Sequence, residues 1–160
     1  MQLQERGLLN VDDKISKYIN GSKWEKEITI HHLLTHTSGL PKDGLFLGQS
    51  YVSLEKNIEH IKNYSLWFEP GPKYSYSNAG YQILAAIIEK VSGESYNNYI
   101  KNNIFLPLRM NNSKGGTDSS YGENQAIGYQ ILTKEASRLS IYNFSCITGS
   151  GNIYSNVEDL

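Results

Sequence analysis

The sequence predicts an α/β (α+β) fold dominated by helices, and three observations support this. Apolar residues in the segment 79–91 recur at helical spacing, and shorter segments on both sides repeat the pattern. The candidate strands are short and lie in the last third of the chain, at 126–133 and 140–147. The composition, with 39% hydrophobic and 19% charged residues, is that of a folded globular chain. A length of 160 residues favours one domain.

Three helices are expected in the first half of the chain. The first follows Asp12 and Asp13, either of which could cap its N-terminus through a side-chain carboxylate. Thr29 is expected to cap the second helix, which ends before Gly39. The third covers 53–64, where apolar residues again fall on one helical face.

The strongest helix prediction begins after Asn78 and ends at Gly93. The Pro-Gly-Pro sequence at 70–72 precedes it and forms a turn, because proline fixes its own φ and lacks a backbone N–H. A further helix is expected over 96–105. The Asn-, Gly- and Ser-rich segment 111–124 is expected to be a loop.

Charge and hydropathy argue against several classes of function. Lys and Arg total 15 against 16 for Asp and Glu, which gives nucleic-acid binding no support. The longest apolar run, 83–88, is far too short to span a bilayer, so no membrane segment is expected in this chain. The N-terminus has no basic stretch followed by an apolar core, so no leader is expected within it. Cys146 is alone, which excludes a disulfide within the chain.

Two histidines raise the question of a metal site. His32 and His36 lie four residues apart, so on a helix they would share one face. A zinc hydrolase with this spacing needs His-Glu-x-x-His, in which the glutamate is the general base, whereas residues 33–35 here are Leu, Leu and Thr. We therefore expect structural roles for both histidines, and neither a metal nor a cofactor.

The segment 74–78, Tyr-Ser-Tyr-Ser-Asn, is the best candidate for chemistry. The rigid turn before it and the helix after it hold its side chains in place. A tyrosine here could shuttle protons if cations lowered its pKa from about 10. An asparagine two residues later could bind a substrate amide. The segment alone fits better with two buried tyrosines and an asparagine that caps the helix.

Five motifs occur in a fixed order along the chain. They are Gly-Leu-Leu-Asn-Val-Asp-Asp at 7–13, Ile-Thr-Ile-His-His-Leu-Leu-Thr-His-Thr-Ser-Gly-Leu-Pro at 28–41, Phe-Glu-Pro-Gly at 68–71, Tyr-Ser-Asn at 76–78 and Gly-Asn-Ile-Tyr-Ser at 151–155. Their order and spacing resemble the serine β-lactamase-like family, which comprises class C β-lactamases, D,D-peptidases and related esterases. The resemblance spans nearly the whole chain.

The resemblance implies both a fold and a mechanism. The fold is that of β-lactamases and D,D-peptidases, of which this chain would hold the helix-rich part without most of the central antiparallel sheet. In the mechanism, the serine of a Ser-x-x-Lys motif attacks a carbonyl and forms an acyl-enzyme. By resemblance, Tyr76 is the catalytic base and acid and Asn78 binds the substrate. The resemblance assigns no chemistry to His36.

Two motifs of this family are expected outside the chain. Ser-x-x-Lys precedes the 7–13 motif in the family, so the nucleophile would lie before Met1, and the Lys-Thr-Gly strand would follow Leu160. The Ser-x-x-Lys match from Ser53 to Lys56 is in the wrong order and is expected by chance. Residues 1–160 are therefore expected to be one partial domain, truncated at both ends and inactive alone.

Substrate, partners and location remain open within this interpretation. A longer parent protein would act on a small molecule or a cell-wall peptide: a β-lactam, a D-Ala-D-Ala peptide or an ester. The alternative is a non-catalytic homologue or binding module with the same fold. Apolar surface left uncovered by the missing sheet predicts self-association. The resemblance implies an extracytoplasmic or membrane-associated location for the full-length protein, with a cytoplasmic location as the alternative. One local departure from the family pattern is Arg109, which replaces the glycine of a tight turn.

Overall fold

The computed structural model describes residues 1–42, 51–116, 125–131, 136–138 and 143–160. The helices are α1 (Gln2–Glu5), α2 (Ile30–Leu34), α3 (Leu54–Ile61), α4 (Asn78–Ser92) and α5 (Tyr96–Ile100). Shorter helical turns are η1 (Ile15–Lys17), η2 (Lys101–Phe105) and η3 (Phe144–Ile147). The strands are β1 (Lys114–Gly115), β2 (Tyr129–Ile131), β3 (Ala136–Arg138) and β4 (Ile153–Tyr154). This helix-rich α/β arrangement confirms the predicted fold class.

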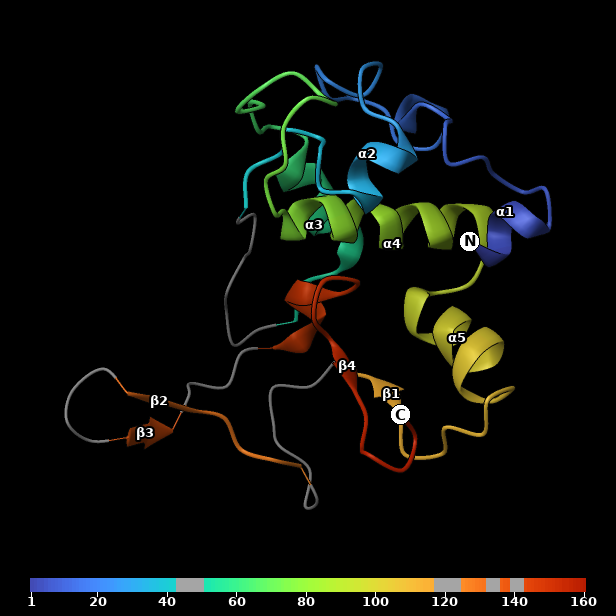
Figure 1. The fold of residues 1–160 in the computed structure, drawn as a ribbon, viewed down its shortest axis with the longest axis vertical. Coiled ribbons are helices and arrows are strands. Elements are labelled where there is room, and N and C mark those ends of the chain that lie inside the picture. Colours follow the sequence, from blue (N-terminus) through green and yellow to red (C-terminus); the bar gives the residue numbers. More distant parts are fainter. Residues whose placement is uncertain (43–50, 117–124, 132–135, 139–142) are drawn as a thin grey trace.

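Helix α4 is the central element, and α1, α2, α3 and α5 all contact it (Figure 1). Ser77 caps its N-terminus, because the Ser77 Oγ accepts a hydrogen bond from the Gly80 N–H at 3.2 Å. Gly93 ends the helix in the left-handed conformation, with φ of 74°. The strongest helix prediction is thus confirmed, with Ser77 rather than Asn78 as the capping residue.

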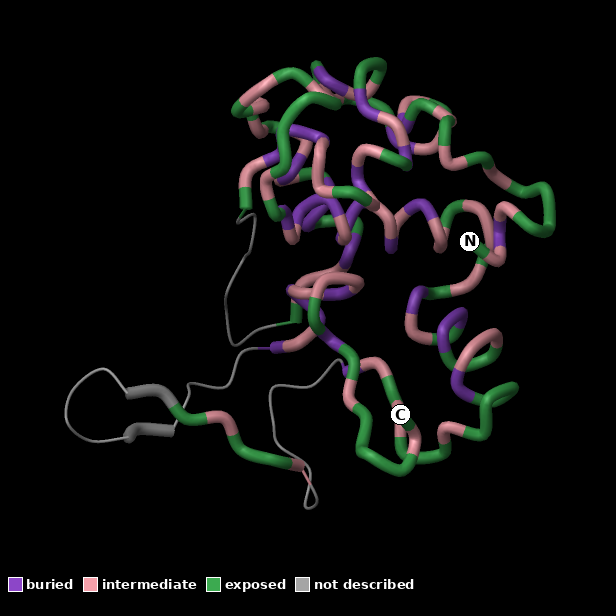
Figure 2. Tube along the Cα trace, viewed as in Figure 1, coloured by how far each residue is buried: buried purple, intermediate pink, exposed green. Residues whose placement is uncertain are grey.

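The hydrophobic core lies where α2 and α3 meet α4 (Figure 2). Its fully buried aliphatic side chains come from segments far apart in the sequence: Ile15, Ile28, Leu33, Leu40, Ile61, Ile83 and Ile87. Burying each such side chain stabilises the fold by roughly 1.5–3 kcal/mol. This cluster therefore fixes the first forty residues against α4. Among the described residues, no helix has the length and apolar character needed to cross a membrane.

The strands form two small antiparallel pairs. β1 pairs with β4, with Lys114 opposite Tyr154, and β2 pairs with β3, with Tyr129 opposite Arg138. The predicted strand at 126–133 is confirmed for Tyr129–Ile131. The predicted strand at 140–147 is wrong for residues 143–147, which contain the helical turn η3, and its first three residues lie outside the described ranges.

The turn before η1 also differs from the prediction. Lys14 precedes η1 and provides no side-chain cap, so capping by an aspartate is wrong. The Asp13 carboxylate instead accepts hydrogen bonds from the Tyr18 hydroxyl, the Lys17 ammonium group and the Asn10 N–H. These bonds, that from Tyr18 first, lower the pKa of Asp13 to about 2.

Candidate active site

Two segments that are distant in the sequence, 36–42 and 71–78, run side by side and lead into α4. Three backbone hydrogen bonds of 2.9–3.0 Å join them, from the N–H groups of Gly71, Ser75 and Asn78 to the carbonyls of Thr37, His36 and Lys42. The loop that carries the Tyr-Ser-Asn motif is therefore held along the chain that leaves α2.

Gly39 is needed for this close approach. Its φ is 77°, and a Cβ at this position would lie 2.2 Å from the carbonyl oxygen of Phe68. The Gly39 carbonyl also accepts a hydrogen bond from the Trp67 N–H at 2.8 Å. Any side chain at residue 39 would push the chain that leaves α2 away from Phe68, just before the segment 71–78.

Tyr76 lines a cleft of about 410 Å³ between the first turns of α4 and the segment 149–153. The described residues that line it are His36, Tyr76, Tyr81, Gly149, Ser150, Gly151, Asn152 and Ile153. Tyr76 is 44% exposed, so a molecule in the cleft could contact its side chain. Asn78 is the first residue of α4 and is not among these lining residues. The structure thus brings Tyr76, but not Asn78, to the cleft wall.

His36 lines the cleft beside Tyr76 and lies in a cluster of tyrosines. Its ring centroid is 4.6 Å from that of Tyr76, 4.9 Å from that of Tyr81 and 5.9 Å from that of Tyr74. Its Nδ1 accepts a hydrogen bond from the Ser77 N–H at 3.2 Å. The neutral ring therefore carries its proton on Nε2. Burial lowers the pKa of His36 below its ordinary value of 6.5.

The segment 149–153 forms the opposite wall of the cleft and packs directly on α4. Gly149 has a φ of 82°, and a Cβ there would lie 2.8 Å from the carbonyl oxygen of Tyr81. The buried Asn152 side chain accepts a hydrogen bond from the Gly149 N–H and donates to Asn97 and to the Gly116 carbonyl. The sequence interpretation missed this role of Asn152, because its partners are separated from it by up to 55 residues.

His32 lies at the start of α2 and takes part in its capping. Its N–H donates to the Thr29 Oγ1 at 3.2 Å, and its Nδ1 accepts from the Thr29 N–H at 3.3 Å. The predicted Thr29 cap is therefore confirmed. Within the described part of the chain, no three His, Cys, Asp or Glu side chains gather as a metal ion would require.

Ser53 has a structural role that explains its spacing to Lys56. The Ser53 Oγ accepts a hydrogen bond from the Lys56 N–H at 3.3 Å and caps the N-terminus of α3. Neither residue is among those that line the cleft beside Tyr76. This arrangement supports the prediction that the Ser-x-x-Lys match is a coincidence of sequence.

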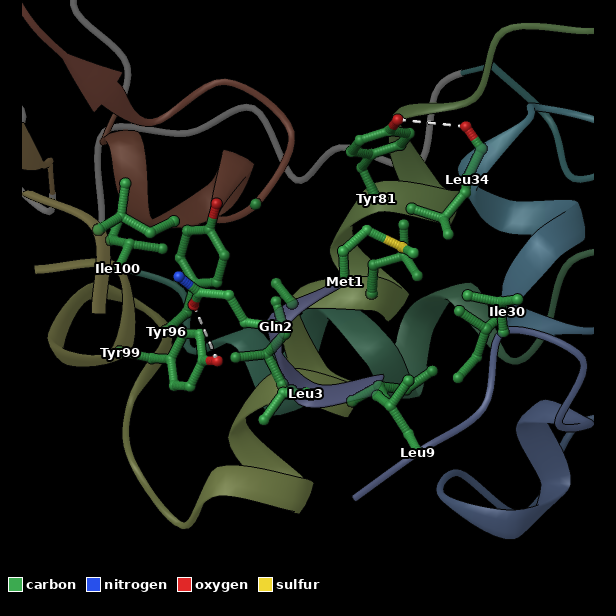
Figure 3. A pocket seen from close by; sticks show the side chains of 17 residues that line it. Met1, Gln2, Leu3, Leu9, Ile30, Leu34, Tyr81, Tyr96, Tyr99 and Ile100 are labelled. Atoms are coloured by element: carbon green, nitrogen blue, oxygen red, sulfur yellow. Dashed lines mark hydrogen bonds between the residues drawn. The ribbon is translucent and has the colours of Figure 1, made fainter. Parts of the chain in front are cut away.

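A second cavity, of about 510 Å³, is lined mostly by apolar side chains from α1, α2, α4 and α5 (Figure 3). Two of its tyrosines are tied by hydrogen bonds of 3.3 Å, from the Tyr81 hydroxyl to the Leu34 carbonyl and from the Tyr99 hydroxyl to the Gln2 Oε1. Tyr81 and Gly149 line both this cavity and the cleft beside Tyr76. The two spaces therefore share a wall.

Comparison with known proteins agrees with the motif order. The Beta-lactamase family model matches residues 1–160. Penicillin-binding protein 4* of Bacillus subtilis (strain 168) is 38% identical over 122 residues, which cover 70% of this chain and 26% of that protein. The putative penicillin-binding protein PbpX of the same strain is 33% identical over 162 residues, which cover 100% of this chain and 40% of that protein.

A solved structure gives the same result for the fold. The octameric penicillin-binding protein homologue from Pyrococcus abyssi is 34% identical, with a TM-score of 0.73 over 99% of this chain and 39% of that one. The chain thus spans between a quarter and two fifths of the length of these three relatives. With the family model matched along its whole length, the chain belongs to the Beta-lactamase family and shares the serine-hydrolase fold of its penicillin-binding relatives.

Proposed function

We propose that this chain carries the Tyr-x-Asn portion of the active site of a serine hydrolase that acts through an acyl-enzyme on β-lactams, D-Ala-D-Ala peptides or esters. The observation that carries the proposal is the exposed Tyr76 side chain on the wall of a cleft, immediately before the 15-residue helix α4. In this role Tyr76 is the general base and acid, and Asn78 orients the amide of the substrate.

Tyr76 needs positive charge around it to act as a base. A phenol has an unperturbed pKa of about 10 and is protonated at neutral pH. The N-terminus of α4 contributes the equivalent of about half a positive charge. The two lysines of the family motifs, which are expected outside residues 1–160, would supply the rest. We therefore propose that the chain alone is inactive and that the complete protein forms an acyl-enzyme with its substrate through the serine of its Ser-x-x-Lys motif.

Covalent labelling with fluorescent penicillin and with a fluorophosphonate tests this function. The complete protein encoded by the gene is expected to be labelled, and residues 1–160 alone are not. In the complete protein, Tyr76→Phe is expected to lower the labelling rate by about 10²–10⁴-fold, because general base and acid catalysis is lost while the ring remains. Tyr74→Phe is the matched control, since Tyr74 lies in the same loop but does not line the cleft.

Two outcomes would contradict the proposal in different ways. Labelling of residues 1–160 that disappears in Ser53→Ala would make Ser53 a nucleophile and would replace the proposed site. No labelling of either protein, together with reversible binding of intact penicillin measured by calorimetry, would identify a non-catalytic homologue that uses the same cleft for binding.

A further inference from the structure

His36 occupies a backbone position that is costly for a histidine. Helix α2 ends with two hydrogen bonds, from the Thr37 N–H to the His32 carbonyl at 2.9 Å and from the His36 N–H to the Leu33 carbonyl at 3.3 Å. In this termination motif the residue at the position of His36 takes a left-handed conformation, for which glycine is preferred. The φ of His36 is 56°, so its backbone conformation is strained by the close approach of the Cβ to the following carbonyl oxygen. Strain that persists at one residue indicates that its side chain has a role.

The contacts of the imidazole indicate what that role is. The Nδ1 atom accepts the hydrogen bond from the N–H of Ser77, the residue that caps α4 and directly follows Tyr76. The imidazole ring packs on the ring of Tyr76, with a centroid distance of 4.6 Å and an interplanar angle of 37°. It also stacks on the ring of Tyr81, with a centroid distance of 4.9 Å and an interplanar angle of 25°. His36 therefore holds both the backbone after Tyr76 and the Tyr76 ring itself.

We propose that His36 is a positioning residue, whose neutral imidazole fixes Tyr76 on the cleft wall through the Ser77 N–H and ring packing, and releases it on protonation. The meaning of this role for catalysis rests on the proposed function of Tyr76. The geometry itself does not, because the hydrogen bond and the ring contacts are present whatever Tyr76 does.

Protonation breaks this arrangement because it turns an acceptor into a donor. In the imidazolium ion both ring nitrogens carry protons, so Nδ1 would face the Ser77 N–H donor to donor. In the part of the chain that the structure describes, no carboxylate acts on His36 to offset the added charge. Among the described residues, the titratable groups that pack on it are the phenols of Tyr74, Tyr76 and Tyr81, and residues 149–153 carry none.

Two further effects act on the protonated ring. Attraction between a cation and the tyrosine faces favours the imidazolium, but it leaves the clash between two donors in place. Burial acts against the imidazolium and lowers the pKa of His36. Because the folded-state pKa lies below the unfolded value of 6.5, the contribution of His36 to stability is complete above pH 6.5 and decreases as pH falls from there toward the folded-state pKa.

Three substitutions of His36 separate the hydrogen bond, the ring and the backbone strain. His36→Asn keeps an acceptor near the position of Nδ1, tolerates a left-handed φ and does not titrate. His36→Phe keeps an aromatic ring and loses the acceptor. His36→Gly removes the strain and every side-chain contact. Arg109→Gly is the matched control for strain alone, since Arg109 has a φ of 59°.

The first readout is the rate of fluorescent-penicillin labelling of the complete protein at about pH 7.5, roughly one unit above the ordinary histidine pKa. Arg109→Gly is expected to stay within about threefold of the unsubstituted protein, and His36→Asn, which keeps the acceptor but loses the ring contacts, is expected to lie between that rate and the rate of His36→Phe. His36→Phe and His36→Gly are expected to be slower by about tenfold to a hundredfold, as for a misplaced catalytic group. In His36→Asn the decrease in rate that accompanies histidine protonation at acid pH is expected to disappear. Rates for His36→Phe equal to the unsubstituted protein would overturn the proposal.

A spectroscopic readout tests the proposal even if the protein is not labelled at all. In the complete protein with ¹⁵N-labelled histidine, the His36 Nδ1 is expected to give the signal of an unprotonated nitrogen at neutral pH. The Ser77 amide and the Tyr76 ring signals are expected to shift with the same midpoint as His36 when the pH is lowered. A protonated Nδ1 at neutral pH, or Tyr76 signals that do not change while His36 titrates, would refute the positioning role. Failure of labelling with these signals intact would count against the proposed function only.

Discussion

At the scale of single residues, Asp13 predicts how stability responds to acid. Three hydrogen bonds hold the pKa of its carboxylate at about 2, below the ordinary value of 3.8, with the Tyr18 hydroxyl the largest cause. Because the folded-state pKa is depressed, this contribution to stability is present above pH 3.8 and is lost as the pH falls toward 2.

Tyr18→Phe is expected to weaken this acid dependence, since it removes the strongest of the three bonds to Asp13. Urea unfolding midpoints measured from about pH 6 down to about pH 2, a range that spans the ordinary pKa and reaches the folded-state pKa, give the comparison. Asp12→Asn is the control, because the neighbouring Asp12 is exposed and lacks these bonds. An equal acid dependence in Tyr18→Phe and in the unsubstituted chain would contradict the assignment.

Single residues also show what sequence reasoning cannot reach. Tyr76 and Asn78 were identified from a local motif, because the motif itself defines their spacing. The hydrogen bond between His36 and Ser77 joins residues 41 positions apart and depends on where α2 ends. The sequence around either residue therefore does not predict it. A left-handed histidine is likewise invisible in sequence, since the termination motif that requires it normally has glycine.

At the scale of elements, the turn that follows η2 (Lys101–Phe105) contains a strained residue, Arg109. The Arg109 N–H donates to the Leu106 carbonyl and the Met110 N–H to the Phe105 carbonyl, the same termination pattern as at α2. Arg109 adopts the left-handed conformation that the family's glycine would take without strain. The tight turn, which the replacement of glycine by arginine put in doubt, therefore forms in spite of the arginine.

Arg109→Gly is expected to raise the free energy of unfolding by about 0.5–1 kcal/mol. Relief of left-handed strain contributes about 1–2 kcal/mol, and the greater freedom of glycine in the unfolded chain offsets part of it. Urea denaturation at neutral pH measures the difference. Gly93→Ala provides the reverse control and should be destabilising, since Gly93 has a φ of 74° and open space around a Cβ. A loss of stability in Arg109→Gly would disprove this account.

Elements also differ in how far the sequence determines them. The helices α3 and α4 were predictable because their apolar faces follow helical spacing, whereas the serines that cap them, Ser53 and Ser77, were not identified as caps from the sequence. The segment 143–147 was predicted as a strand, yet the side-chain amides of Asn57 and Gln82 both donate to the Cys146 carbonyl and hold a helical turn there. These partners lie 89 and 64 residues away, beyond any local pattern.

At the scale of the whole molecule, the apolar cavity beside α4 predicts self-association of residues 1–160. Partly buried side chains of Leu84 and Ile88 line it, and contact with a second copy would remove this surface from water. Ile88→Lys is expected to shift the chain toward monomer in sedimentation velocity runs over a range of concentrations. Val157→Lys is the control, because Val157 is 91% exposed and does not line the cavity. A monomeric unsubstituted chain, or equal association of all three, would rule out this surface.

The side chain of Tyr81 lines the apolar cavity and the cleft beside Tyr76, and it stacks on His36 between them. A molecule that binds in the cavity and displaces this ring would change the free energy with which another molecule binds in the cleft. Thermodynamic reciprocity then requires that a molecule bound in the cleft changes the affinity of the cavity for its own occupant by the same factor. Through the Tyr81 ring, binding in the apolar cavity and binding in the polar cleft would thus depend on each other, so occupancy of one space could be measured as a change of affinity in the other.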